Sequence, residues 1–179
     1  MTPPLPHPPL PHPSESALFD LLDEAGISHE TREHPPIFTV EDGKALKAGL
    51  PGGHTKNLFL KDKAGQFVLV CALTSTTVRL NKLHRELGTK RLSFGSEKAL
   101  YELLRVRPGS VTLFSLIHDS ERQVRLVLDK ALFEPETVWF HPLRNTASTA
   151  IASQDILTFA KAASHPPVVI DFRKLTGSA

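Results

Sequence analysis

A glycine-rich stretch that runs directly into polar residues is the part of this sequence best suited to chemistry. Residues 50–60 read Leu-Pro-Gly-Gly-His-Thr-Lys-Asn-Leu-Phe-Leu. Paired glycines let a backbone approach a ligand closely. The Lys56 ammonium is a compact cation that follows at the start of an apolar strand, where it raises the local positive potential and can anchor a phosphate or a ribose. An ordinary turn before a strand, with Lys56 in solvent, explains the same residues about equally well.

Two further segments concentrate polar side chains beside predicted strands. Residues 140–149 read Phe-His-Pro-Leu-Arg-Asn-Thr-Ala-Ser-Thr, and residues 107–112 read Arg-Pro-Gly-Ser-Val-Thr. The imidazole of His141 can donate or accept a proton near neutral pH. Backbone amides around Gly109 and Ser110 can form a small anion-binding concavity, which would suit an oxyanion. A hydrogen-bonded loop is the alternative explanation of residues 140–149, and most Pro-Gly turns such as the one at 108–109 are only turns.

General motifs for phosphate, nucleotide, serine-nucleophile or zinc chemistry are missing from the sequence. The histidines are scattered, so we expect neither a metal site nor a cofactor. The single cysteine, Cys71, lies in the apolar run 67–73, where a buried small side chain is expected rather than a reactive thiol.

The composition is typical of a globular protein, with 40% hydrophobic and 22% charged residues in a chain of 179. This length fits one domain. The net charge is only +2, so nucleic-acid binding would require a local basic patch. Such a patch is expected around one helix–strand unit, at Lys82, Arg85, Lys90 and Arg91, with Arg105 and Arg107 nearby in sequence. A solvated basic face is the alternative.

Periodicity and turn residues predict an α+β fold, a single compact domain with a mixed, mainly antiparallel sheet and surrounding helices. Helices are expected at 14–25, from Thr39 to about 49, at 80–87, from Ser96 to 104 and from Ser153 to about 163. Strands are expected at 28–34, 57–61, 66–73, 91–94, 111–117, 123–128, 137–140, 146–151 and 168–170. Hairpins should join 57–61 to 66–73 and 111–117 to 123–128.

The ends of the chain are expected to lie outside this domain. Residues 1–13 are rich in proline, which removes backbone donors, so they should form an extended tail. The domain should span 14–172, followed by a C-terminal tail at 173–179. The sequence has neither a membrane-length apolar stretch nor a secretory signal pattern, and we expect a cytoplasmic protein.

The three polar segments, with Lys90-Arg91-Leu92-Ser93-Phe94 between them, resemble the motifs of the editing-domain family of bacterial prolyl-tRNA synthetases. This family includes free-standing deacylases of alanyl- and cysteinyl-tRNA(Pro). The resemblance extends from about Ser14 to about Ile170. The Gly-His-Thr-Lys-Asn and Phe-His-Pro-Leu-x-Asn-Thr-Ala pieces are most similar to the free-standing, alanine-specific branch.

The resemblance implies the editing-domain fold and the hydrolysis of mischarged alanyl-tRNA(Pro) in trans, with Lys56 as the essential lysine. Asn57 and His141 would line the aminoacyl site, and Gly109 would begin a Gly-x-x-x-Pro loop. Leu113 replaces the loop proline and does not fix φ, which puts the rigidity of this loop in doubt. Substrate-binding residues are accordingly expected at His54, Asn57, Gly109, Ser110, Asn145 and Thr146.

The implied partners are the acceptor end of tRNA(Pro) and, as a candidate, prolyl-tRNA synthetase. An editing pocket must admit alanine and reject proline by size, and its wall is expected at Ile37, Phe38, Val40 and Leu46, unless they only pack in the core. Water would be activated by His141 or by the ribose 2′-hydroxyl. The alternatives for function are a cysteinyl-tRNA(Pro) deacylase and a non-catalytic module that binds aminoacyl-tRNA or the synthetase.

Overall fold

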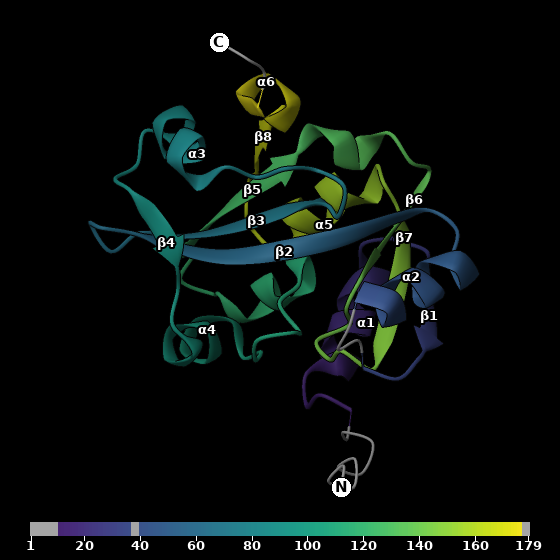
Figure 1. The fold of residues 1–179 in the computed structure, drawn as a ribbon. Helices are drawn as coiled ribbons and strands as arrows, with labels where there is room; N and C mark the ends of the chain where they lie inside the picture. Colours follow the sequence, from purple (N-terminus) through teal and green to yellow (C-terminus); the bar gives the residue numbers. More distant parts are fainter. Residues whose placement is uncertain (1–10, 37–39, 177–179) are drawn as a thin grey trace, which may run out of the picture.

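Strand β2 organises the sheet, because it pairs with three other strands. The computed structural model describes residues 11–36 and 40–176. Its strand order is β1-β7-β6-β2-β3-β5-β8, and β4 pairs with β2 beside this path (Figure 1). The strands are β1 (His29–Glu33), β2 (Gly53–Asp62), β3 (Phe67–Leu73), β4 (Leu92–Phe94), β5 (Val124–Asp129), β6 (Thr137–Phe140), β7 (Ala147–Ala152) and β8 (Val168–Ile170).

Helices cover both faces of this sheet. They are α1 (Glu15–Glu24), α2 (Val40–Gly49), α3 (Leu80–Leu87), α4 (Glu97–Leu104), α5 (Asp155–Ala162) and α6 (Phe172–Thr176), with 3₁₀ helices η1 (Leu113–His118) and η2 (Lys130–Phe133). Four strand pairings are antiparallel and three are parallel. The predicted fold class, an α+β domain with a mixed sheet, is therefore confirmed.

Two apolar cores lie on opposite faces of the sheet, as the alternation of side chains along a strand requires. On one face Phe59 packs with residues of α1, α4, α5 and η1, among which the ring of Phe114 contacts those of Phe140 and Phe159. On the other face Leu60 packs with residues of α3 and α6. In Figure 1, α3 and α6 lie above the sheet and α4 lies below it.

The expected hairpin between 111–117 and 123–128 is wrong. Residues 113–118 form η1, and β5 pairs in parallel with β3 and β8. The Thr112 hydroxyl accepts a hydrogen bond from the amide of Phe114, and the Ser115 hydroxyl donates to the Thr112 carbonyl. These local bonds satisfy a turn of helix, whereas a strand would leave both hydroxyls buried among apolar side chains.

The ends of the described chain are more structured than the sequence suggested. His12, expected in the tail, donates through Nε2 to the Arg105 carbonyl at 2.7 Å, and its Nδ1 accepts the amide of Ser14. At the other end, residues 173–176, also expected in a tail, belong to α6, where Arg173 pairs with Glu134. No helix within residues 11–36 and 40–176 is long and apolar enough to cross a membrane.

Candidate functional site

The turn before β2 is held tightly against the neighbouring strand. The Trp139 indole donates to the Pro51 carbonyl at 2.9 Å, and the His54 ring donates to the Leu50 carbonyl at 2.8 Å. A side chain at Gly52 would meet the Thr137 carbonyl at 2.7 Å, and φ there is +119°. Only glycine fits both conditions. The strand already begins at Gly53, so the following polar residues are strand residues with fixed directions, rather than members of a loop.

The middle of β2 has one edge without a strand partner. On one side it pairs with β3 along residues 55–61. On the other side β6 reaches only His54, and β4 begins its pairing at Leu60. An edge that exposes backbone donors and acceptors in the interior of a sheet offers a place for a bound group. Lys56 and Asn57 lie at this open edge and point to opposite faces of the sheet.

Lys56 is half-buried on the face that α3 covers. Its Nζ donates to the carbonyl of Thr76, and the Thr76 hydroxyl donates to the buried carboxylate of Asp129. Burial lowers the pKa of Lys56, and the nearby Asp129 charge partly opposes that change. The ammonium is therefore held by Thr76, which follows β3, and Thr76 is held in turn by Asp129 at the end of β5. An ammonium has three N–H donors, so further donors can bind a ligand. This differs from a lysine in free solvent.

Asn57 binds the loop that the sequence left in doubt. Its side-chain oxygen accepts the amide hydrogen of Leu113 at 3.1 Å, at the end of the segment that begins at Gly109. A proline at position 113 has no amide hydrogen and would lack this bond. The loop is thus tied to β2 by a side-chain hydrogen bond, where a proline would fix it through its ring. Asn57 has a positioning role here, beside the substrate-binding role predicted for it.

We expect Asn57→Ala to destabilise the protein by about 1–3 kcal/mol, because it leaves the buried Leu113 amide without an acceptor. Asn57→Asp keeps an oxygen at this place and should cost less. In a Leu113→Pro background, Asn57→Ala should cost clearly less than in the wild type, because the amide hydrogen is already gone. Urea unfolding of the four proteins measures this coupling, and additive free energies would contradict it.

His54 and His141 line one small hollow of about 90 Å³ between α2 and the sheet, together with Leu46, Trp139 and Ser148. The Nδ1 of His141 donates to the Ala147 carbonyl at 2.9 Å, which leaves Nε2 as an acceptor in the neutral ring. Burial lowers the pKa of both histidines. Of the expected wall, Leu46 lines the hollow and Val40 begins α2, whereas Ile37 and Phe38 lie outside the described residues.

Burial of His141 should make stability depend on pH. Its folded-state pKa lies below the ordinary 6.5, so the unfolded chain takes up this proton first as the pH falls. The free energy of unfolding should therefore decline below about pH 6.5, by at most about 1.4 kcal/mol per pH unit for one proton, until the folded pKa is reached. His141→Gln lacks this contribution. At pH 8 the difference in free energy of unfolding between the wild type and His141→Gln measures the change in packing alone. If this difference stays constant from about pH 7.5 to about pH 5.5, the effect is refuted.

Gly109, Ser110 and Asn145 gather elsewhere, beside the end of α4. Ser110 and Asn145 line a hollow of about 450 Å³ that Tyr101 and Arg107 also border. The Ser110 amide donates to the Arg107 carbonyl, so it is not available as an oxyanion donor in this conformation. Thr146, expected to bind substrate, instead accepts a hydrogen bond from Arg144, which is paired with two glutamates. Ser110 and Asn145 thus line a different hollow from the one that His141 lines.

The four basic residues expected to bind tRNA flank one helix and one strand, as predicted. Lys82 and Arg85 belong to α3, and Lys90 and Arg91 lie in the connection to β4. Arg85, Lys90 and Arg91 are exposed, while Lys82 is partly covered. The chain enters α3 soon after Thr76, the residue that holds Lys56. The basic surface therefore adjoins the face of the sheet from which Lys56 projects.

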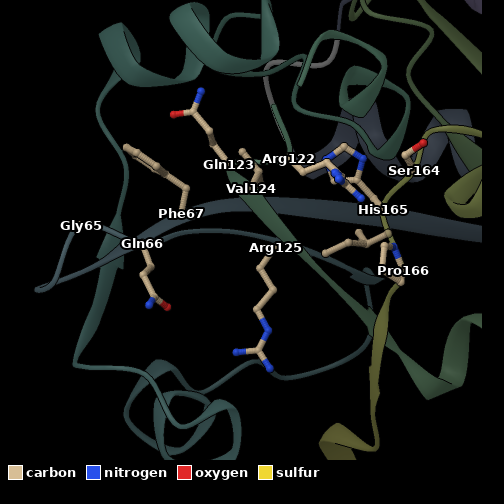
Figure 2. A pocket seen from close by; sticks show the side chains of 11 residues that line it. Gly65, Gln66, Phe67, Arg122, Gln123, Val124, Arg125, Ser164, His165 and Pro166 are labelled. Atoms are coloured by element: carbon tan, nitrogen blue, oxygen red, sulfur yellow. The ribbon is translucent and has the colours of Figure 1, made fainter. Parts of the chain in front are cut away.

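A more spacious hollow of about 640 Å³ lies away from all these residues (Figure 2). It is bordered by the first residues of β3 and β5 and by the connection from α5 to β8, at Phe67, Val124 and His165. Lys56 pairs with Ala72 near the other end of β3, about 15–20 Å along the strand. This hollow contains none of the residues with predicted chemistry, so size alone does not identify the reactive centre.

Sequence reasoning missed the groups that surround Lys56 and His141. The Thr76 carbonyl accepts a hydrogen bond from the Lys56 ammonium, and Asp129 accepts one from the Thr76 hydroxyl. Lys47 donates to the hydroxyl of Thr74 at 3.0 Å beside the His54 hollow. The His34 ring reaches Ser148, and its centroid lies 6.2 Å from that of His141. The run of hydroxyl residues at 74–77 directly after an apolar strand was a usable signal. The position of Asp129 was not, because it depends on parallel pairing between distant strands.

Comparisons with known proteins agree with this geometry. Residues 34–159 match the model of a family described as the aminoacyl-tRNA editing domain. The prolyl-tRNA synthetase associated domain-containing protein 1 of Bos taurus is 39% identical, covering 89% of this chain and 95% of the relative. The prolyl-tRNA editing protein ProX of Acetoanaerobium sticklandii is 32% identical over 83% of this chain and 92% of its own.

Solved structures show the same fold. A crystal structure described as that of a candidate trans-editing enzyme for prolyl-tRNA synthetase superposes with a TM-score of 0.67 at 20% identity, covering 89% of this chain and 96% of the other. The matched range includes the glycine-rich turn, Lys56, the loop at 109–113 and His141. The resemblance found in the sequence is confirmed, and the chain belongs to the aminoacyl-tRNA editing domain family.

Proposed function

We propose that this protein hydrolyses mischarged alanyl-tRNA(Pro) in trans, releasing alanine and free tRNA. Membership of the editing-domain family supports aminoacyl-tRNA deacylation in general, and the similarity to ProX and related proteins supports a link to prolyl-tRNA. The observation that carries the proposal is the half-buried Lys56 ammonium at the open edge of β2, which donates to the Thr76 carbonyl, while Asp129 holds the Thr76 hydroxyl. The partners are the acceptor end of tRNA(Pro) and, in the same proposal, prolyl-tRNA synthetase.

Hydrolysis of the aminoacyl ester needs an oriented carbonyl, a placed water and a group that stabilises negative charge. Lys56 has three N–H donors, of which one goes to the Thr76 carbonyl. In the proposal the remaining donors bind the terminal phosphate, the ribose or the developing oxyanion. A donor fixed before reaction and partly shielded from water stabilises such charge better than a mobile surface lysine does.

Water activation has two proposed routes. His141 keeps a free Nε2 lone pair because Nδ1 is engaged by Ala147, and burial keeps the ring neutral near pH 7 by lowering its pKa. It can therefore accept a proton from water. Alternatively the ribose 2′-hydroxyl of the substrate assists the water, and His141 only orients the ester. If His141→Gln retains its turnover, the second route is favoured. If the variant loses kcat, and its pH–rate profile also loses the decline on the acidic side, the first route is favoured.

The size of the hollow at His141 suits a small aminoacyl group. Its volume of about 90 Å³ corresponds to about three waters of liquid, and Leu46 and Trp139 give it an apolar wall. A synthetase site built for proline discriminates against a smaller residue by only about 1–3 kcal/mol per methylene, so a second site that sorts by size is useful. In the proposal this hollow takes the alanine methyl group and excludes the proline ring.

A deacylation panel with Ala-, Cys-, Ser- and Pro-tRNA(Pro) tests the proposal. We expect rapid release of alanine and no release of proline. Preferred release of cysteine would instead support the cysteinyl-tRNA(Pro) deacylase. Binding of charged tRNA without any turnover would support the non-catalytic module. Adding purified prolyl-tRNA synthetase to the same reactions, and measuring its binding directly, tests the proposed protein partner.

The proposed binding of tRNA phosphates predicts a change in salt dependence. Replacing Lys82, Arg85, Lys90 or Arg91 singly by glutamine should raise KM for charged tRNA. The slope of log affinity against log salt should fall by about one for each phosphate that the variant no longer neutralises. Single-turnover rates at saturating enzyme should be nearly unchanged. Lys161→Gln, on the exposed side of α5, is the matched control. Wild-type slopes in all four variants would place the acceptor stem on another surface.

A further inference from the structure

Phe94 is an exposed aromatic residue that neither the fold nor the proposed chemistry uses. Its side chain is 67% exposed, more than that of any other large hydrophobic residue in the described part of the chain. It ends β4, a strand that pairs only with β2. Leu92, two residues earlier on the same strand, is buried beneath α3, so this face of β4 passes from covered to open.

Both ends of β4 are fixed, so Phe94 is presented from a rigid support. At the start, the amide of Lys90 donates to the buried Asp62 carboxylate at 3.0 Å. At the end, the amide of Gly95 donates to the Phe59 carbonyl at 2.9 Å. Any side chain at Gly95 would collide with the Phe59 ring, so a glycine is required directly after Phe94. This anchoring makes the exposure of Phe94 a property of the fold.

Phe94 lies on the same face of the sheet as Lys56. It pairs directly with Leu60, and paired residues of antiparallel strands project to the same side. Leu60 and Lys56 are four residues apart on β2 and therefore also share a face. The separation along the strand is about 13 Å. At the rise of about 3.4 Å per stacked nucleotide, this distance corresponds to about four nucleotides.

We propose that Phe94 is a stacking platform for a base in the unpaired 3′ end of the charged tRNA, while the terminal aminoacyl-adenosine occupies the site at Lys56. This inference rests on the proposed function. Base–aromatic stacking tolerates any sequence, and single-stranded nucleic acid is bound by aromatic rings combined with cations. Lys90 and Arg91 supply exposed cations in the segment that leads into β4. The neighbouring residues in sequence, Ser93 and Ser96, are polar.

Two substrates separate this role from a structural one. Phe94→Ala should lower kcat/KM for alanyl-tRNA(Pro) about tenfold, the loss expected for one stacked base. Hydrolysis of 3′-O-alanyl-adenosine, which lacks the preceding nucleotides, should be unchanged. Phe94→Trp should retain wild-type activity on both substrates. Leu157→Ala, which trims an exposed apolar side chain on α5, is the control.

A direct readout is the fluorescence of 2-aminopurine placed in turn at each unpaired position of uncharged tRNA(Pro). We expect one position to be quenched on binding the wild type or Phe94→Trp, and not on binding Phe94→Ala. Equal activity of Phe94→Ala and wild type on alanyl-tRNA(Pro), or equal losses on both substrates, would overturn the inference. If the wild type hydrolyses neither alanyl-tRNA(Pro) nor 3′-O-alanyl-adenosine, the proposed function itself is rejected.

Discussion

Replacing Lys56 by alanine is expected to lower kcat for deacylation by about 10²–10³-fold, the usual cost of removing one preorganised donor to developing negative charge. The carbonyl of Thr76 accepts a hydrogen bond from this ammonium at the open edge of β2, and the carboxylate of Asp129 in turn holds the Thr76 hydroxyl. Binding of charged tRNA should weaken much less than turnover does, because most phosphate contacts in the proposal belong to α3 and the connection from α3 to β4.

The same strand provides a matched control for that experiment. Lys61 lies five residues further along β2 and is exposed, with its ammonium 5.6 Å from the centre of the Phe67 ring. Lys61→Ala should leave single-turnover rates near the wild-type value. Lys56→Met, which keeps the aliphatic stem, should lose as much turnover as Lys56→Ala does. Near-wild-type rates in a folded Lys56→Met protein would remove Lys56 from the reactive centre.

Local patterns predicted most helices and the β2–β3 hairpin correctly, because each depends on neighbours in the sequence. The apolar run before Leu73 and the turn at 62–65 are sufficient for that hairpin. The run at 111–117 has the same apolar character, yet it forms η1. Short apolar runs do not distinguish strand from helix. The choice at η1 depends on the Thr112 and Ser115 hydroxyls and on the parallel pairing of β5, which is a long-range contact.

The candidate site was only partly predictable for the same reason. Lys56, Asn57 and His141 were found because each lies in a motif that is contiguous in the sequence. Their second partners come from distant elements, as in the hydrogen bond from the Leu113 amide to Asn57 and the contact of Lys56 with Thr76. The family resemblance also implied one site for all the polar segments, whereas Asn145 lines a different hollow from that of His141.

His165 shows the limit most clearly. It stands before Pro166 and Pro167, in the connection between the expected helix that ends near 163 and the expected strand at 168–170, and no role was predicted for it. In the structure it is buried, and its Nε2 lies 2.8 Å from the carboxylate of the equally buried Asp119. Its Nδ1 lies 2.6 Å from the Ala163 carbonyl, so both ring nitrogens have an oxygen partner. A contact between two residues that are 46 positions apart in the sequence cannot be predicted from a local pattern.

We expect Asp119→Ala to lower the free energy of unfolding by about 3–5 kcal/mol, because it removes one partner of a buried, hydrogen-bonded pair. The carboxylate also accepts the amides of Gln123 and Val124 at the start of β5, and these would be left without an acceptor. For a chain of this size the loss corresponds to about 10 °C in Tm. Differential scanning calorimetry measures it, and Lys98→Ala, which breaks the exposed helical pair with Glu102, should cost only about 0.5 kcal/mol.

Because Asp119 lies at the opposite end of β5 from Asp129, turnover per folded molecule should be preserved. In a His165→Leu background, Asp119→Ala should cost clearly less, since the hydrogen bond between the ring and the carboxylate is already gone. A shift in Tm no larger than that of Lys98→Ala would show that the pair contributes little, and loss of turnover in the folded variant would show that this end of the sheet communicates with Lys56.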